Sequence, residues 1–300
     1  MLKNAVWCLS LCISFLFVCS AQAAVAQDSK AANLSQLKLM EDSLVHTADS
    51  MFYTPIPDFR TEYCERFVKQ LIRTLKINGA NTYPFDSLSK LINIIAPEDK
   101  SFRIFNWGIA YSEVRLRYYG AIQMNQEELK LYPLYDNSDL LAKTDEDKIL
   151  GAKDWIGGII YNIITKKWDG ENVYCLLGVN DGNPISTKKY IDPMMFTDKG
   201  PMFGAPIFAV GSEKNPNKGV NRFVLEYKKG VSVGLNWDEA HKAILFDDIA
   251  SQINDPNRKY TFVPTGQYNG LRWSNGAWRF VPNMIQVKEL KDGEAPSNDK

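Results

Sequence analysis

The stretch Leu271-Arg-Trp-Ser-Asn-Gly-Ala-Trp-Arg-Phe-Val281 decides how the second half of this 300-residue chain folds. Asn275-Gly276 stands between two aromatic runs. This dipeptide is the strongest short-range signal for a β-hairpin, because both central positions of the turn need a positive φ. A two-residue loop also sets the register of the strands. Trp273 is therefore predicted to face Trp278 across the hairpin, an aromatic pair that contributes roughly 0.2–1 kcal/mol.

Other segments between predicted strands downstream of residue 100 also have sequences that favour tight turns. The same register opposes Arg272 and Arg279 on the second face of the hairpin, where two like charges are mildly unfavourable. Asp169-Gly170 lies between two apolar runs and predicts another hairpin. Lys229-Gly230 and Pro264-Thr265-Gly266 fit two further tight turns, because proline presets φ and glycine adopts a positive one.

Aromatic and β-branched runs cut by Gly, Asn and Asp recur from about residue 101, a pattern typical of consecutive antiparallel strands. Residues 99–283 are therefore predicted to form an antiparallel β domain, and a meander, a sandwich and a propeller-like arrangement all fit the spacing. The predicted strands cover 101–107, 114–124, 129–135, 156–167, 172–179, 187–196, 205–210, 221–228, 231–237, 243–247, 259–263, 267–273 and 277–281.

Residues 24–98 have helical rather than strand periodicity. Pro55 and Pro57 are predicted to end a first helix, Asp58 to cap a second, and Pro97 to end a short third one. Short helices of this kind gain most of their stability by packing an apolar face against a partner. The apolar faces of the three helices comprise Leu37, Met40, Leu44, Ala48 and Met51; Cys64, Phe67, Val68, Leu71, Ile72 and Leu75; and Phe85, Leu88, Leu91, Ile92 and Ile95.

Residues 1–23 have the pattern of a secretory signal peptide: a lysine, a short apolar run and small residues before the cleavage site. Cleavage is predicted after Ala23, with Ala26 as the alternative. The apolar run, residues 5–19, is shorter than the roughly 20 residues of a membrane-spanning helix, so an uncleaved anchor is disfavoured. Lipoprotein anchoring at Cys19 is also disfavoured, because Val18 stands where a small residue is expected. We therefore predict an exported protein, in the periplasm or on the outer surface.

The chain downstream of the signal peptide limits the possible partners. No second apolar run of spanning length follows, so the mature chain is predicted to have no transmembrane segment. Because 35 basic residues balance 35 acidic ones, the charge gives no reason to expect a nucleic-acid partner. Cys64 and Cys175 are the cysteines left after cleavage. Each lies in an apolar run, so two separate buried thiols are favoured over a disulfide. Residues 284–300 are predicted to be a polar tail.

Residue types that carry catalysis or bind cofactors are scarce. His46 and His241 are the two histidines, so neither a zinc site nor any other cofactor is predicted. His241 follows Trp237-Asp238-Glu239-Ala240 and lies near Asp247 and Asp248, which permits an acid–base pair, but a loop or short-helix residue between strands is the favoured interpretation. No Gly-x-Ser-x-Gly motif is present. A hydrolase acting on envelope glycans or peptides is the alternative function, and it rests only on a set of carboxylates: Asp136, Asp139, Asp192, Glu226, Asp238 and Glu239.

Aromatic content is the most distinctive feature, with 7 Trp, 14 Tyr and 15 Phe. Trp237, Tyr268, Trp273 and Trp278, with Trp168, are predicted to lie at strand ends and turns, where flat rings could stack on a sugar. The structural alternative is that these residues simply fill the core. We therefore expect a non-enzymatic envelope binding or structural protein, and its partner is a glycan or another envelope protein.

Six segments together resemble a group of uncharacterised exported proteins of the Bacteroidota type, over most of the mature length. The resemblance implies export and a β-rich body, and it implies no activity and no site residues. The segments are Phe102-Arg-Ile-Phe-Asn-Trp107, Tyr118-Tyr-Gly-Ala-Ile-Gln123, Leu131-Tyr-Pro-Leu-Tyr-Asp136, Lys189-Tyr-Ile-Asp192, Phe203-Gly-Ala-Pro-Ile-Phe208 and Arg222-Phe-Val-Leu-Glu-Tyr-Lys228.

The fold predicted from all these patterns is α+β. N-terminal helices are expected to pack on a larger antiparallel β domain.

Overall fold

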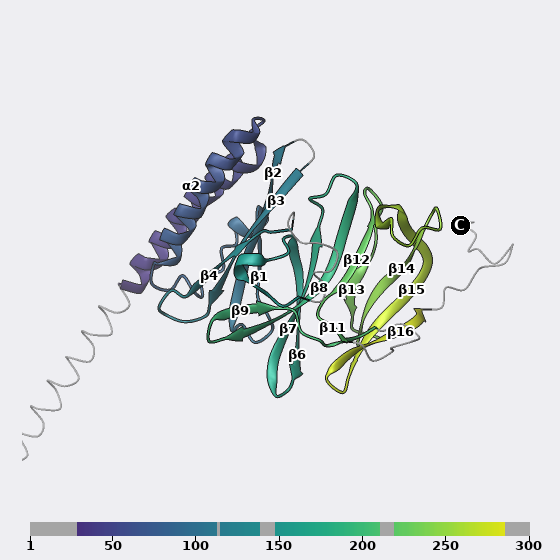
Figure 1. The fold of residues 1–300 in the computed structure, drawn as a ribbon. Coiled ribbons are helices and arrows are strands. Elements are labelled where there is room, and N and C mark those ends of the chain that lie inside the picture. The colour runs from purple at the N-terminus through teal and green to yellow at the C-terminus, as the bar shows by residue number, and fades with distance from the viewer. Residues whose placement is uncertain (1–28, 113–114, 139–147, 211–218, 286–300) are drawn as a thin grey trace, which may run out of the picture. The chain divides into compact units, whose positions relative to one another are not determined.

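The computed structural model describes residues 29–112, 115–138, 148–210 and 219–285. The predicted signal peptide and almost all of the predicted tail lie outside these ranges. The chain divides into two compact units, one of residues 1–92 and 123–130, the other of residues 93–122 and 131–300. The first contains helices and the second is rich in antiparallel strands (Figure 1). The predicted α+β class is therefore confirmed.

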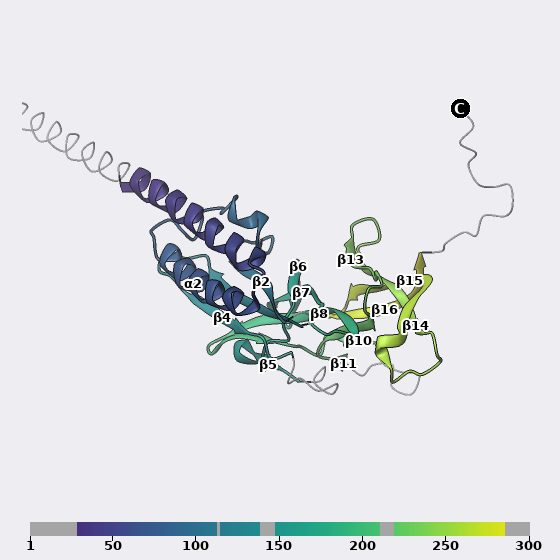
Figure 2. The same ribbon diagram turned by 90° about the horizontal axis from the view of Figure 1, so that it is seen from above.

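Two helices lie side by side in the first unit (Figures 1 and 2). One covers residues 29–53, and the other, α2, covers Pro57–Leu75. Most of the predicted stripe residues are buried, but Met40, Val68 and Ile72 are only partly buried, and the polar residues Glu41, Thr47 and Thr74 are buried as well. Glu41 is the one charged residue among them. Its carboxylate accepts hydrogen bonds from the Tyr83 hydroxyl at 2.5 Å and from the backbone N–H groups of Ser87 and Leu88 at 2.8 and 3.0 Å. These three donors balance the cost of burying the charge.

Two details of the helical prediction are wrong. The N-cap of α2 is Ile56 without a side-chain cap, since Pro57 occupies the first turn, where its missing N–H costs nothing. Asp58 therefore lies inside the helix. The third helix is replaced by a single 3₁₀ turn, η1 (Leu88–Lys90), followed by strand β1 (Asn93–Ile95). Ile95 instead pairs with Ile104 of the next strand, β2 (Phe102–Ser112), so ladder hydrogen bonds override the helical spacing.

The described residues of the second unit form three sheets. The first has the order β1-β2-β3-β4, the second β5-β9-β8-β7-β6 with β12 beside β8, and the third β11-β10-β16-β15-β14-β13. The strands are β2 (Phe102–Ser112), β3 (Arg115–Met124), β4 (Leu131–Tyr135), β5 (Leu150–Gly151), β6 (Ile159–Trp168), β7 (Glu171–Asn180), β8 (Ser186–Thr197), β9 (Gly200–Phe203), β10 (Phe208–Ala209), β11 (Gly219–Val220), β12 (Phe223–Lys228), β13 (Leu235–Asp238), β14 (Ala243–Ser251), β15 (Phe262–Ser274) and β16 (Ala277–Ile285).

The second and third sheets share one hydrophobic core, as in a sandwich. Val173, Cys175 and Ile191 enter it from the second sheet, and Ile244 and Leu271 from the third. Within these two sheets the pairings are antiparallel except between β10 and β16, which are parallel. A bulge in β6 lies between Ile160 and Asn162, at Tyr161. The Tyr161 hydroxyl donates to the backbone oxygen of Leu235 on β13 at 2.6 Å and so links the edge strands of the two sheets.

The two predicted hairpins are confirmed. Asp169-Gly170 and Asn275-Gly276 have positive φ at both positions, and Trp273 pairs with Trp278 as expected. Pro264-Thr265-Gly266, by contrast, lies inside β15 rather than between strands. The register against β14 shifts there, so the positive φ of Gly266 serves a bulge and not a hairpin turn.

Cys64 and Cys175, both within the described residues, are buried and are not joined by a disulfide. Neither helix in the described part of the chain has the combination of length and apolar character that a bilayer crossing requires.

Candidate functional site

Four tryptophans from separate strands meet at one end of the sandwich. Trp168 ends β6, Trp237 lies on β13, and Trp273 and Trp278 flank the turn between β15 and β16. The ring centroids of Trp273 and Trp278 are 5.2 Å apart and those of Trp237 and Trp278 are 6.4 Å apart, both with edge-on geometry. Trp168 lies beside this turn: a Cβ atom added to Gly276 would be 3.7 Å from Cδ1 of the Trp168 ring. We call these four residues the tryptophan cluster.

Trp278 is the fully buried floor of the cluster. Its indole N–H donates to the Cys175 sulfur at 3.3 Å, and burial raises the pKa of that thiol to about 12. Trp278, one of the predicted contact residues, therefore presents no surface to solvent. Trp168, Trp237 and Trp273 are partly exposed and pack on the same core.

Lys166 places a cation against two of these rings. Its Nζ lies 4.9 Å from the centroid of Trp237 and 5.5 Å from that of Trp278. Lys166 is on β6 two residues before Trp168, so strand alternation directs both side chains to the same face of the sheet. Desolvation lowers the pKa of the ammonium.

Polar side chains of the turn between β13 and β14 border the cluster. Trp237 Nε1 donates to Glu239 Oε2 at 2.7 Å, and the Lys242 ammonium bonds to the other oxygen of that carboxylate. The Asp238 carboxylate accepts from the backbone N–H of His241 at 2.8 Å and contacts its Nδ1 at 2.7 Å. His241 is thus an exposed turn residue that caps Asp238, in agreement with the favoured interpretation.

Tyr268, the fourth predicted contact residue, does not join the cluster. It lies on β15 five residues before Trp273, which is about 17 Å along an extended strand. It pairs with Asp247 and Ile285 rather than with an indole. The structure thus brings together the three predicted tryptophans and places Tyr268 elsewhere on the same sheet.

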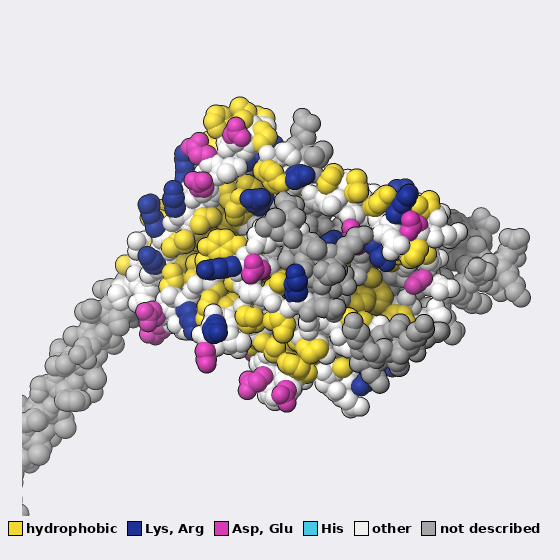
Figure 3. All heavy atoms as spheres, viewed as in Figure 1, with side chains coloured by type: hydrophobic (Ala, Val, Ile, Leu, Met, Phe, Trp, Pro, Cys, Tyr) yellow, Lys and Arg dark blue, Asp and Glu magenta, His cyan; other side chains and the backbone are white. Residues whose placement is uncertain are grey.

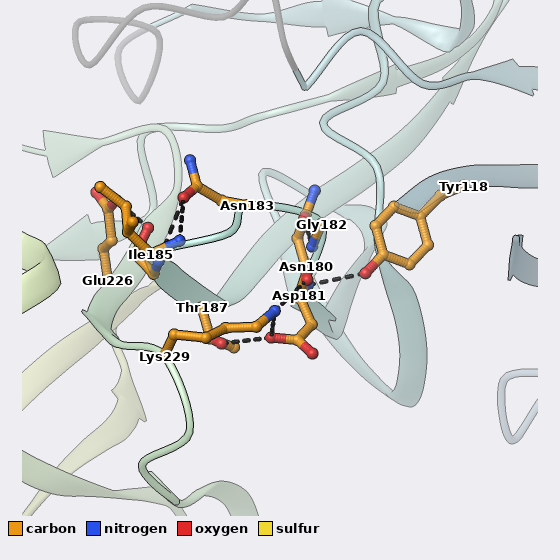
Figure 4. A network of polar contacts seen from close by, with 10 residues as sticks. Tyr118, Asn180, Asp181, Gly182, Asn183, Ile185, Thr187, Glu226 and Lys229 are labelled. Carbon is orange, nitrogen blue, oxygen red and sulfur yellow. Dashed lines mark hydrogen bonds and ion pairs between the residues drawn. The ribbon is translucent and has the colours of Figure 1, made fainter. Parts of the chain in front are cut away.

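A second polar network holds the loop between β7 and β8 (Figure 4). The Asp181 Oδ1 accepts from Lys229 Nζ and from Thr187 Oγ1, both at 2.5 Å. The backbone N–H of Asp181 donates to the Tyr118 hydroxyl at 2.8 Å. Asn183 accepts from the two backbone N–H groups that follow it in the loop. The side-chain oxygens of this loop therefore serve its own conformation, as expected for a turn rather than a cation site.

The carboxylates considered for hydrolysis have separate partners. Asp136 accepts from two backbone N–H groups, Glu226 accepts from the Ser186 hydroxyl at 2.7 Å, and the fully buried Asp192 pairs with Arg222 Nε at 2.8 Å. Asp139 lies outside the described residues. Within the described ranges, no three His, Cys, Asp or Glu side chains gather as a metal site would require.

The helical unit exposes its own apolar group at the turn between the two helices. Tyr53, Ile56 and Phe59 are 73%, 49% and 48% exposed. Figure 3 shows apolar side chains over this end of the helices. The tryptophan cluster is the better defined candidate site, because side chains from four strands converge there with a lysine and a carboxylate.

Comparison with known proteins finds no match: no family model, no curated protein and no solved structure resembles the chain.

The sequence indicated the three tryptophans but not Lys166. Its position two residues before Trp168 was the available signal, since alternation puts both on one face. Its contact with Trp237 depends on how the two sheets pack, which strand alternation alone does not specify.

Proposed function

We propose that the protein is an exported envelope protein that binds a glycan through the tryptophan cluster and does no chemistry on it. The observation that supports the proposal is the convergence of three partly exposed indoles around a buried fourth. Flat apolar rings with a few fixed polar groups are a suitable surface for a sugar. The C–H face of the sugar stacks on the rings, and its hydroxyl groups form hydrogen bonds with polar side chains at the border of the cluster. Glu239 and Lys242 supply such polar groups.

The core position of Trp278 favours a preformed site. A floor that is packed on Cys175 cannot rearrange without disturbing the core, so the neighbouring rings are held in place before a ligand arrives. Preorganisation lowers the entropy lost on binding. Export is supported by the sequence of residues 1–23.

The binding test uses a panel of soluble envelope-type oligosaccharides, including a neutral hexamer of β-1,4-linked N-acetylglucosamine, with isothermal titration calorimetry. We expect binding by the wild type and a loss of about five- to tenfold in affinity for Trp237→Ala and for Trp273→Ala, as expected for one aromatic contact. Tyr268→Ala is the matched control, an exposed aromatic residue on the same strand as Trp273. No binding to any member of the panel, or equal loss in all three variants, would contradict the proposal.

The export test is separate. Mass spectrometry of the protein isolated from the cells that produce it is expected to show a mature N-terminus after Ala23 or Ala26. An intact Met1 on cytosolic material would overturn the proposed location and leave the binding result unaffected.

A further inference from the structure

Lys166, the cation in the tryptophan cluster, has no carboxylate partner among the described residues. The ion pairs of the described residues involve other side chains: among the lysines, Lys242 pairs with Glu239 and Lys229 with Asp181. Glu171 pairs with Trp168 on the neighbouring strand β7, and among the described residues it makes no ion pair with Lys166. Lys166 therefore contacts the π faces of Trp237 and Trp278 without a carboxylate to accept from its ammonium.

This environment disfavours the charged form of Lys166. The side chain is partly buried, and desolvation is the main reason that its pKa is lowered; the nearby Lys242 ammonium acts in the same direction and Cys175 in the opposite one. Contact with aromatic faces offsets only part of the lost hydration, and it satisfies none of the ammonium hydrogen-bond donors. An anionic group reaching Lys166 would restore both the charge balance and the hydrogen bonds.

The surrounding residues define what kind of anion fits. Trp168, Trp237 and Trp273 offer flat apolar surface, and Glu239 is already engaged by Trp237 and Lys242. A small inorganic anion would leave the rings unused. A sugar that has both an apolar face and a carboxylate would use the rings and the ammonium together.

We propose that the ligand of the tryptophan cluster is an acidic glycan and that Lys166 binds its carboxylate. This inference rests on the proposed glycan-binding function and adds the charge of the ligand. Two sources have this chemistry, the lactyl carboxylate of a muramic acid residue and the ring carboxylate of a uronic acid.

The test compares each acid with its own neutral ester. The probes are the disaccharide of N-acetylglucosamine and N-acetylmuramic acid, and trigalacturonate, each as the free acid and as the methyl ester. We expect the wild type to bind at least one acid about tenfold or more tightly than its ester at low salt, and the ratio to fall as NaCl is added. The acid that binds more tightly than its own ester shows whether a muramic acid or a uronic acid supplies the carboxylate.

Variants assign the preference to Lys166. In Lys166→Gln the ratio of acid to ester affinity is expected to fall to about one, whereas Lys166→Arg retains it. Lys167→Gln is the matched control, an exposed lysine next to Lys166 on the opposite face of β6, and its ratio should stay close to that of the wild type. Circular dichroism confirms that each variant is folded.

The outcomes separate the two proposals. Equal binding of acid and ester by the wild type, with loss in Trp237→Ala, overturns the role of Lys166 and leaves the glycan site intact. A preference that survives in Lys166→Gln also overturns it. Binding of neither acid overturns this inference, and the neutral panel then decides the proposed function by itself.

Discussion

Two lysines of the β-rich unit have opposite environments. Lys229 Nζ lies 2.5 Å from Asp181 Oδ1 and also donates to the backbone oxygen of Asp181, in a network that fixes the loop between β7 and β8 (Figure 4). Lys166 Nζ faces the rings of Trp237 and Trp278 and has no carboxylate partner in the described structure. The first lysine belongs to a closed network, whereas the second retains unused hydrogen-bond donors.

This difference shows where the molecule has capacity to bind. A polar network in which donors and acceptors match stabilises its own loop and gains little from a ligand. A partly desolvated ammonium on aromatic rings gains from an anion, because its interaction with the protein is incomplete. Variants that remove one element at a time can test this comparison.

The largest effect is expected from the floor of the tryptophan cluster. Trp278→Ala should lower the free energy of unfolding by about 3–5 kcal/mol, because it leaves a cavity in the shared core. Trp273→Ala, on the partly exposed side of the same pair, should cost about 1–2 kcal/mol. Urea denaturation measures both. Equal losses of unfolding free energy in the two variants would contradict the distinction between a buried Trp278 and a partly exposed Trp273.

The contrast between those two indoles also shows how far the sequence allowed the site to be predicted. Asn275-Gly276 fixes which residues pair, so the contact between Trp273 and Trp278 followed from two turn residues. Which face of that pair is buried depends on the second sheet. Nothing local to the hairpin indicates that β6 and β7 cover Trp278 with Cys175 and Lys166.

The errors in the fold prediction have the same origin. Residues 85–95 have helical spacing, yet Ile95 pairs with Ile104, and Glu41 from a distant helix accepts the N–H groups that begin η1. Pro264-Thr265-Gly266 has turn chemistry that a bulge uses equally well. Each strand or turn was recognisable from its own residues, whereas the partner that selects between two local alternatives lay far away in the sequence.

The comparison of the two lysines gives the next effect. Lys229→Met should lower the free energy of unfolding by up to about 1 kcal/mol, since its ion pair is partly exposed. Lys166→Met should change it by less than about 0.5 kcal/mol, because an apolar chain packs against the indoles without a desolvation cost. The measurement is chemical denaturation in low salt. A larger loss in Lys166→Met would make that lysine a structural element rather than a binding one.

A third set of cations tests whether unpaired charge by itself weakens the sheet. Arg272 and Arg279 are exposed and oppose each other across β15 and β16. Arg272→Glu should raise the free energy of unfolding by roughly 0.2–1 kcal/mol, since it converts a like-charge pair into an opposite one. Arg272→Gln is the control for loss of repulsion alone. Thermal denaturation of the three proteins should rank Glu above Gln above Arg.

The smallest effect is the acid response at the border of the cluster. Backbone and side-chain hydrogen bonds from His241 lower the pKa of Asp238 below its ordinary value of about 3.9. A carboxyl group with a lowered pKa in the folded state stabilises the fold above its unfolded pKa, and that contribution is lost as the pH falls through the folded pKa. A carbon-detected NMR titration of the Asp238 carboxyl group measures this pKa directly, with His241→Ala as the comparison. His241→Ala removes the ring contact and keeps the backbone donor, so the pKa should rise only part of the way. A pKa of Asp238 at or above the ordinary value in the wild type would show that the turn does not hold this carboxylate.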